Sequence, residues 1–144
     1  MFVGEYRYSL EEKGRLFIPV EFRRELLPEA QDTFVATRGY DKCIAVYPSD
    51  IWRERERVLL SYPYDTPDNR WRVRHFTSHA KYMKVDRQGR VNIPQHLLDY
   101  GGLNKEVLII GVLQAIELWA PDEYSRCEKE FDPSKGGMFP NLKI

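Results

Sequence analysis

The sequence has few cysteines, no long hydrophobic run and no net charge. Two cysteines in 144 residues, Cys43 and Cys127, make neither a disulfide framework nor a CxxC metal knuckle. The longest apolar stretch, residues 107–113, is far shorter than the roughly 20 residues that span a bilayer. The N-terminus also lacks an apolar segment of signal-peptide length. These absences predict a protein of the reducing cytoplasm that is neither exported nor inserted into a membrane.

Recognisable catalytic patterns are missing as well. There is no G-x-S-x-G elbow, no glycine loop that would cradle a phosphate, and no evident pairing of carboxylates for acid–base work. The sequence therefore favours a protein that is not an enzyme, with no cofactor and no small-molecule substrate.

A metal site has only weak support. His75 and His79 are four residues apart on a predicted helix, a spacing that can place two imidazoles on one metal ion. No third ligand accompanies them, so an ordinary surface or interface helix is the favoured interpretation. A metal-dependent hydrolase stays open as a third hypothesis.

What the chain does have is a repeated motif. Residues 10–23 (LEEKGRLFIPVEFR) and 85–98 (VDRQGRVNIPQHLL) share one frame, with an acidic residue four positions before each arginine. The identical pairs are Gly14/Gly89, Arg15/Arg90, Ile18/Ile93 and Pro19/Pro94. A second correspondence aligns residues 39–52 with residues 111–124. Two copies predict a pseudo-symmetric fold in which the halves pack against each other, because a solenoid needs at least three units.

Each half has the same predicted order of elements. Alternating apolar residues indicate a strand at 5–10, a glycine turn at Lys13-Gly14 and a second strand at 15–18. Pro19 then ends that strand and opens a short helix. The remaining predicted elements are strands at 34–38, 43–47, 81–85, 90–93, 107–110 and 116–119, and helices at 49–60, 69–80, from Pro94 and near Pro121. The fold class is α+β and mainly β, with short helices.

The chain divides along the same pattern. We expect a first half at 1–60, a connector and helix at 61–80, a second half at 81–125 and a C-terminal tail at 126–144. The connector contains two prolines among small polar residues, which is typical of a link between structured parts. The tail, with Gly136-Gly137 and Pro140, has little regular pattern and could pack on a neighbouring subunit.

Charge is distributed unevenly although the formal net charge is zero. Between Arg70 and Arg90 the basic residues far outnumber the single acid, Asp86, whereas acids predominate around residues 122–132. Such segregation can steer a polyanion onto one face of the molecule, although a basic stretch of this kind is about as often a solvated helix face. The basic segment could serve DNA or a subunit interface.

The two motifs are the best candidate site. A glycine turn places the following arginine at the start of a strand, so that its guanidinium projects from a rigid corner. We expect Asp86 to hold the guanidinium of Arg90 through paired hydrogen bonds, and Glu11 to do the same for Arg15. An oriented arginine suits phosphates and guanine edges, where two parallel hydrogen bonds form together. The competing interpretation is that each acid and arginine form only an exposed ion pair, worth about 0–1 kcal/mol, that pins the turn.

The motifs resemble a known family. An opening Met1-Phe2-x-Gly4, the Lys13-Gly14-Arg15 turn with Ile18-Pro19 and the Asp86-x-x-Gly89-Arg90 turn with Ile93-Pro94 are together similar to the MraZ family of bacterial transcriptional regulators. Those proteins carry a D-x-x-x-R motif in each of two tandem SpoVT/AbrB-like halves, and the resemblance covers residues 1–125. Glu11 departs from the aspartate that is usual in the first motif.

The resemblance implies a cytoplasmic, nucleoid-associated DNA-binding repressor. Such a protein would bind short direct repeats in double-stranded DNA upstream of its own division and cell-wall gene cluster. The resemblance also implies a pseudo-twofold, swapped-hairpin barrel and a homo-oligomer that closes into a ring. The residues carried over by position, with their turn neighbours, are Arg15, Arg90, Lys13 and Arg87 for DNA binding and Glu11, Gly14, Asp86 and Gly89 for orienting the motif. The alternative is a protein–protein assembly or antitoxin-like module, suggested by the aromatic region 62–71 and the tail.

Overall fold

The computed structural model describes residues 1–144, and it is an α+β fold of antiparallel strands and short helices, as expected. The turns fall where the glycines predict them, since Lys13, Gly14 and Gly89 all have positive φ. The strands are β1 (Glu5–Ser9), β2 (Arg15–Phe17), β3 (Thr33–Arg38), β4 (Ile44–Pro48), β5 (Lys81–Lys84), β6 (Arg90–Asn92), β7 (Glu106–Val112) and β8 (Ala115–Trp119). The helices are α1 (Val20–Arg23), α2 (Ser49–Leu60), α3 (Pro67–Thr77), α4 (Gln95–Gly101) and α5 (Pro121–Glu130), with 3-10 turns η1 (Glu12–Gly14) and η2 (Pro28–Ala30).

One six-stranded sheet contains strands from both ends of the chain. Its order is β1-β7-β8-β4-β3-β5, and all of its pairs are antiparallel. This order keeps its pairings when each strand is exchanged for its counterpart in the other sequence copy, with β1 for β5, β3 for β7 and β4 for β8. The central register, Ile44 opposite Leu118 and Val46 opposite Ile116, follows the same exchange. The repeat seen in the sequence is thus a repeat of strand pairing.

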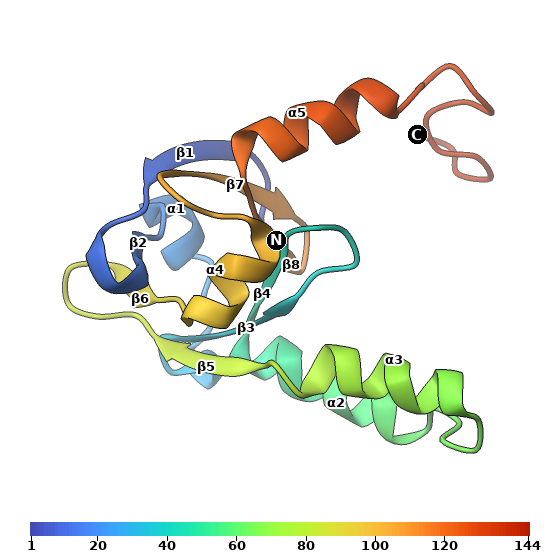
Figure 1. The fold of residues 1–144 in the computed structure, drawn as a ribbon, viewed down its shortest axis with the longest axis horizontal. Helices are drawn as coiled ribbons and strands as arrows, with labels where there is room; N and C mark the ends of the chain where they lie inside the picture. Colours follow the sequence, from blue (N-terminus) through green and yellow to red (C-terminus); the bar gives the residue numbers. More distant parts are fainter.

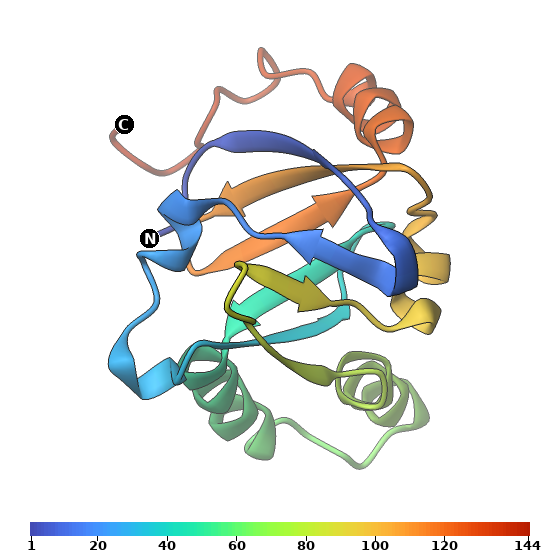
Figure 2. The same cartoon turned by 90° about the vertical axis from the view of Figure 1, so that its left-hand side faces the viewer.

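The remaining two strands, β2 and β6, pair only with each other. The glycine turn joins β1 to β2 along the chain, but the ladder partner of β1 is β7 and that of β2 is β6. Figure 2 shows β2 and β6 side by side in front of the larger sheet. Each motif is therefore completed by the other motif.

A single main core lies between the two sheets. Leu16 and Val91 from the β2–β6 pair are buried in it beside Phe22 of α1 and Leu97 of α4. Strand residues from both sequence copies, such as Phe34 and Ile109, belong to the same cluster. The main core is therefore shared by the two copies, and a smaller buried cluster of Val35, Ala45, Tyr47 and Trp52 belongs to the first copy alone.

Helices α2 and α3 lie together at one end of the molecule, and α5 with the C-terminal residues lies at the opposite end (Figure 1). Phe76 of α3 stacks on Trp52 of α2 with ring centroids 5.0 Å apart. The helix predicted at 69–80 is shifted, because Thr66 caps its start by accepting from the Asn69 N–H at 3.2 Å and Pro67 occupies its first turn. It ends at Thr77, so His79 is not on it. No helix is long and apolar enough to cross a membrane.

Candidate nucleic-acid interface

The β2–β6 pair brings the two motif arginines onto one surface. Arg15 lies opposite Asn92 and Arg90 lies opposite Phe17, whereas the central pair is Leu16 with Val91. Because side chains alternate along a strand, the buried central pair points into the core and the flanking positions point outward. Diagonal positions of this kind are roughly 7–8 Å apart. Two arginines that are distant in sequence therefore lie near each other on the outer face.

The two glycine turns are joined by reciprocal hydrogen bonds. The Ile18 N–H donates to the Gly89 carbonyl at 2.9 Å, and the Ile93 N–H donates to the Gly14 carbonyl at 2.8 Å. Gly14 has φ +76° and Gly89 has φ +84°, a backbone region that residues with a side chain rarely adopt. Each turn is thus fixed by the strand that follows the other turn.

Asp86 organises its own turn, not the arginine side chain. Its Oδ1 accepts the backbone N–H groups of Gln88 at 2.8 Å and Arg90 at 2.9 Å. The hydrogen bond from the Arg90 backbone is the largest cause that lowers the pKa of Asp86 below its usual value, and the Gln88 N–H adds to it. The expected paired bonds from the Arg90 guanidinium to Asp86 are wrong, because the turn folds the carboxylate over its backbone amides.

The Arg90 guanidinium is held by the other motif. Its Nε donates to Glu11 Oε2 at 2.6 Å, and its Cζ lies 5.7 Å from the centre of the Phe17 ring. The side chain of Arg90 is only 28% exposed. Our expectation that Glu11 would hold Arg15 is therefore also wrong, since β2–β6 pairing presents Glu11 to Arg90. The side chain of Glu11, which is longer than that of an aspartate, thus connects the first motif to the second.

The other predicted cations are unpaired. Lys13, Arg15 and Arg87 are exposed, and none of them makes a side-chain hydrogen bond or ion pair within the chain. Lys13 and Arg87 belong to the two glycine turns, and Arg15 lies at the start of β2. With Arg90 they form a surface, named here the turn surface, that holds four basic residues and the acids Glu11, Glu12 and Asp86.

Arg23 also lies in this region, although the sequence motifs did not identify it as a site residue. Its Nε donates to the Ile18 carbonyl at 2.9 Å, and its guanidinium carbon lies 4.9 Å from the centre of the Phe17 ring. A Cβ placed on Gly89 would lie 2.6 Å from that guanidinium carbon, so the glycine leaves room for the arginine. In the second motif the equivalent position is Leu98, which is buried. The two sides of the turn surface are consequently not identical.

The histidines do not assemble a metal site. His75 faces Tyr100 with ring centroids 6.0 Å apart, whereas His79 faces His96 at 5.4 Å. No group of three or more metal-ligating side chains occurs in the structure. The metal-dependent hydrolase hypothesis therefore has no set of ligands to support it.

The two cysteines lie in one region of the fold, because Cys127 packs against the buried cluster that contains Cys43. Cys43 is fully buried, and that burial strongly raises the pKa of its thiol. Cys127 is half-buried on α5, and neither forms a disulfide. Cys43 is thus part of the packed interior.

Comparison with known proteins identifies close relatives. The family described as "MraZ protein, putative antitoxin-like" matches residues 1–74 and 76–135. A protein of Syntrophomonas wolfei named "Transcriptional regulator MraZ" is 44% identical over 142 residues, which cover 99% of this chain and 96% of that protein. Proteins of the same name from Natranaerobius thermophilus and Halothermothrix orenii are 40% and 47% identical, over 93% and 83% of this chain and 91% and 81% of those proteins.

Proposed function

Since the chain belongs to the MraZ family of transcriptional regulators, we propose that it is a sequence-specific DNA-binding regulator whose contact surface is the turn surface. The observation that carries this proposal is the pairing of β2 with β6, which gathers Arg15, Arg90, Lys13 and Arg87 from two distant motifs. Relatives that share the sequence over nearly its full length are named transcriptional regulators.

The chemistry of these side chains suits duplex DNA. Arginine can make two parallel hydrogen bonds to the O6 and N7 of guanine, and lysine or arginine can neutralise a phosphate. Arg90 is already oriented by Glu11, and Asp86 with the two glycines fixes the turns that carry Lys13 and Arg87. Glu11, Gly14, Asp86 and Gly89 are in this proposal the residues that orient the contact surface.

The proposal extends to the target and to the assembly. The protein would act as a repressor of its own division and cell-wall gene cluster by binding short direct repeats, and it would be cytoplasmic and associated with the nucleoid. The cross-paired motifs support a pseudo-twofold, swapped-hairpin barrel with halves at 1–60 and 81–125, a connector at 61–80 and a tail at 126–144. A homo-oligomeric ring would present many turn surfaces to successive repeats, and avidity would supply what one small surface lacks.

Fluorescence anisotropy with a labelled duplex tests the contact surface. The duplex comes from rounds of selection on a random pool, in which a short motif recurring at regular spacing is the expected product. Arg15→Ala and Arg90→Ala should each weaken binding, by about 1–3 kcal/mol if the arginine reads a base. Arg57→Ala on α2 is the matched control, because Arg57 is exposed and makes no side-chain hydrogen bond or ion pair.

Equal losses for all three variants would show that the motifs are not the contact surface. Selection that enriches no sequence would remove the proposal of sequence-specific binding. Circular dichroism of each variant, compared with the unaltered protein, excludes loss of fold as the cause of weak binding.

One observation favours a second candidate function, an antitoxin-like module that binds another protein. Tyr64 and Trp71 are 54% and 64% exposed near the α2–α3 end, and the matched family is itself described as antitoxin-like. Under this alternative a stable protein partner would be retained in a pull-down while no DNA is shifted. The regulator is favoured because the relatives' names state that activity.

A further inference from the structure

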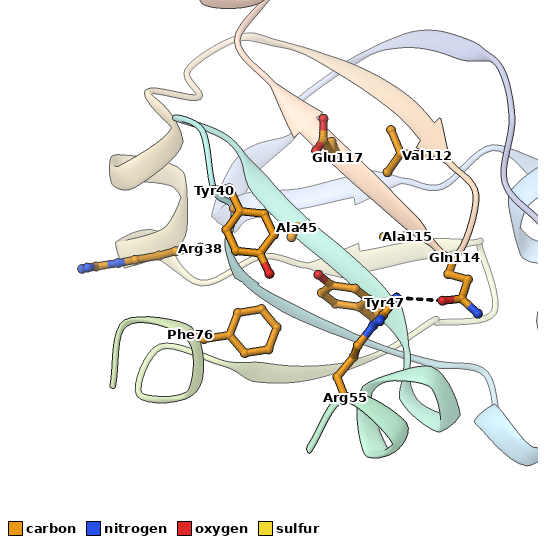
Figure 3. Close-up of a pocket in the computed structure, with 11 residues that line it drawn as sticks. Arg38, Tyr40, Ala45, Tyr47, Arg55, Phe76, Val112, Gln114, Ala115 and Glu117 are labelled. Carbon is orange, nitrogen blue, oxygen red and sulfur yellow. Dashed lines mark hydrogen bonds between the residues drawn. The ribbon is translucent and has the colours of Figure 1, made fainter. Parts of the chain in front are cut away.

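An apolar groove lies between α2 and α3, away from the turn surface. Its volume is about 980 Å³, and apolar side chains from both helices line it. Val58 and Trp71 in this lining are 67% and 64% exposed. A smaller cavity of about 150 Å³ adjoins it, with Tyr47 and Phe76 in both linings (Figure 3). The single chain leaves this apolar surface uncovered.

The groove also carries uncompensated positive charge. Arg38, Arg55 and Arg72 line it, and none of them forms an ion pair with a carboxylate. Arg55 instead donates to the amide oxygen of Gln114 at 2.7 Å (Figure 3), and Arg72 donates to Asn69 at 2.9 Å. Asp68 is the one acid in the lining. An occupant that combines apolar and acidic side chains would match this surface.

The opposite end of the molecule combines exposed apolar side chains with a small excess of acid, since residues 121–144 contain five acids and four basic residues. After the acidic helix α5, the segment 131–144 exposes large apolar side chains and makes hydrogen bonds only within itself and to the end of α5. These side chains are Phe131 at 63%, Met138 at 57%, Phe139 at 52%, Leu142 at 61% and Ile144 at 92% exposed. Figures 1 and 2 both place this segment beyond α5, on the far side of the sheet from α2 and α3.

We propose that residues 131–144 of one copy dock in the α2–α3 groove of the next copy, with the two acids of α5 that are not paired with Arg126, Asp122 and Glu128, beside the groove arginines. Because the segment lies beyond α5 while its own groove lies across the sheet, a second copy is the occupant that geometry favours. A chain of this length reaches at most about 50 Å when extended, which is long enough to lie along a groove of this size. The inference rests on the proposed homo-oligomer and specifies how its subunits meet.

A contact between opposite ends of identical chains has a defined consequence for assembly. The two surfaces in contact are different, so each copy retains a free groove at one side and a free tail at the other. Such a heterologous contact propagates until a ring closes, whereas a contact of groove with groove would stop at a dimer. Assembly by this route leaves the turn surface free for DNA.

Sedimentation velocity on two variants tests the inference. Val58→Glu places a carboxylate in the apolar groove, and truncation after Glu130 removes the docking segment. Each should lose the wild-type oligomer and sediment as a monomer. Val3→Glu is the matched control, because Val3 is 65% exposed, lies outside the groove lining and undergoes the same change. The control should keep the full assembly, and a thermal melt of each variant confirms that the fold is retained.

Mixing the two variants provides the decisive measurement. The Val58→Glu chain keeps its tail and the truncated chain keeps its groove, so together they should form a one-to-one heterodimer and nothing larger. Absence of a heterodimer, or a truncated chain that still forms the full oligomer, would overturn the inference. A wild-type chain that sediments as a monomer would overturn it too, together with the proposed ring.

DNA binding remains separately measurable in this scheme. Anisotropy at high protein concentration reports the turn surface even in unassembled chains, where loss of avidity weakens binding without abolishing it. If the variants assemble as expected but no chain binds the selected duplex, the proposed DNA function fails and the assembly contact stands.

Discussion

At the scale of single residues, Arg15 and Arg90 hold equivalent places in the sequence and different places in the structure. Arg90 is fixed by the Glu11 carboxylate at 2.6 Å and lies near the Phe17 ring, whereas Arg15 is exposed and unpaired. A side chain that is held before binding loses less conformational freedom when it binds. Under the proposed function, Arg90 is therefore prepared for a directional contact, whereas Arg15 would be ordered only when DNA binds.

A double-mutant cycle measures how much the contact between Glu11 and Arg90 contributes to the free energy of DNA binding. Glu11→Ala should weaken DNA binding less than Arg90→Ala does, because it frees the guanidinium without removing it. The two effects should not add, since Glu11 acts through Arg90. Anisotropy titrations of the two single variants and the double variant supply the coupling energy. Strict additivity would mean that Glu11 contributes independently of the arginine.

The two motif glycines allow a matched comparison of stability. A Cβ on Gly14 would collide with the backbone carbonyl of Ile93, while a Cβ on Gly89 would meet the side-chain end of Arg23. Gly89→Ala should cost about 1–2 kcal/mol for its left-handed backbone alone. Gly14→Ala should cost more, because a backbone atom must move. Urea denaturation of both variants gives the difference, and equal midpoints would contradict the argument.

At the scale of elements, one face of β2 packs into the core and the other face carries the proposed DNA contact. Leu16 is fully buried and contributes to the core, whereas the neighbouring Arg15 is exposed on the turn surface. The same alternation applies to β6, with Val91 inward and Arg90 outward. Substitutions within this short strand should therefore change stability and the proposed DNA contact independently.

Substitutions of adjacent residues test this separation. Leu16→Ala should lower the free energy of unfolding by about 2–5 kcal/mol, since it removes buried methyl groups and leaves a cavity. Arg15→Ala should leave the free energy of unfolding nearly unchanged and weaken DNA binding. Chemical denaturation and anisotropy on the same preparations provide both readouts. A destabilised Arg15→Ala protein would show that the arginine also supports the fold.

These elements also show which features of the fold could be predicted from the sequence and which could not. Alternating residues and glycine turns predicted the strands and short helices correctly, because those signals are local. The partner of β2 is β6, and local alternation does not specify a partner that is more than seventy residues away. That pairing decides that Glu11 contacts Arg90, which is why the predicted guanidinium contacts of both motif acids were wrong. The left-handed turns needed only their immediate neighbours and were predicted.

At the scale of the whole molecule, a formal net charge of zero conceals a separation of charge. The turn surface holds Lys13, Arg15, Arg87 and Arg90 beside three acids, whereas residues 121–144 hold five of the 22 acids and four basic residues. Attraction of a duplex would therefore come from one surface and not from the total charge.

The dependence of DNA binding on salt follows from this arrangement. Each neutralised phosphate contributes about 0.9 to the slope of log K against log salt concentration on duplex DNA. Lys13→Ala should reduce the slope by about 0.9, because a lysine suits a phosphate contact. Arg90→Ala should lower the affinity for DNA at every salt concentration. This loss should be larger than the part that the change in the salt slope accounts for. Anisotropy across a salt series measures both, and a wild-type slope near zero would remove the electrostatic argument.

The strand order β1-β7-β8-β4-β3-β5 also constrains how the chain comes to fold. During synthesis β1 leaves the ribosome early, but its partner β7 begins only at Glu106, and β2 must await β6. The first strands consequently spend most of translation without a ladder, with the residues of the future core accessible to chaperones and proteases. Pairing between distant segments is slow to form, because the intervening chain must be ordered first. Folding is thus delayed until most of the chain has been made, and a prematurely terminated product would be a substrate for degradation.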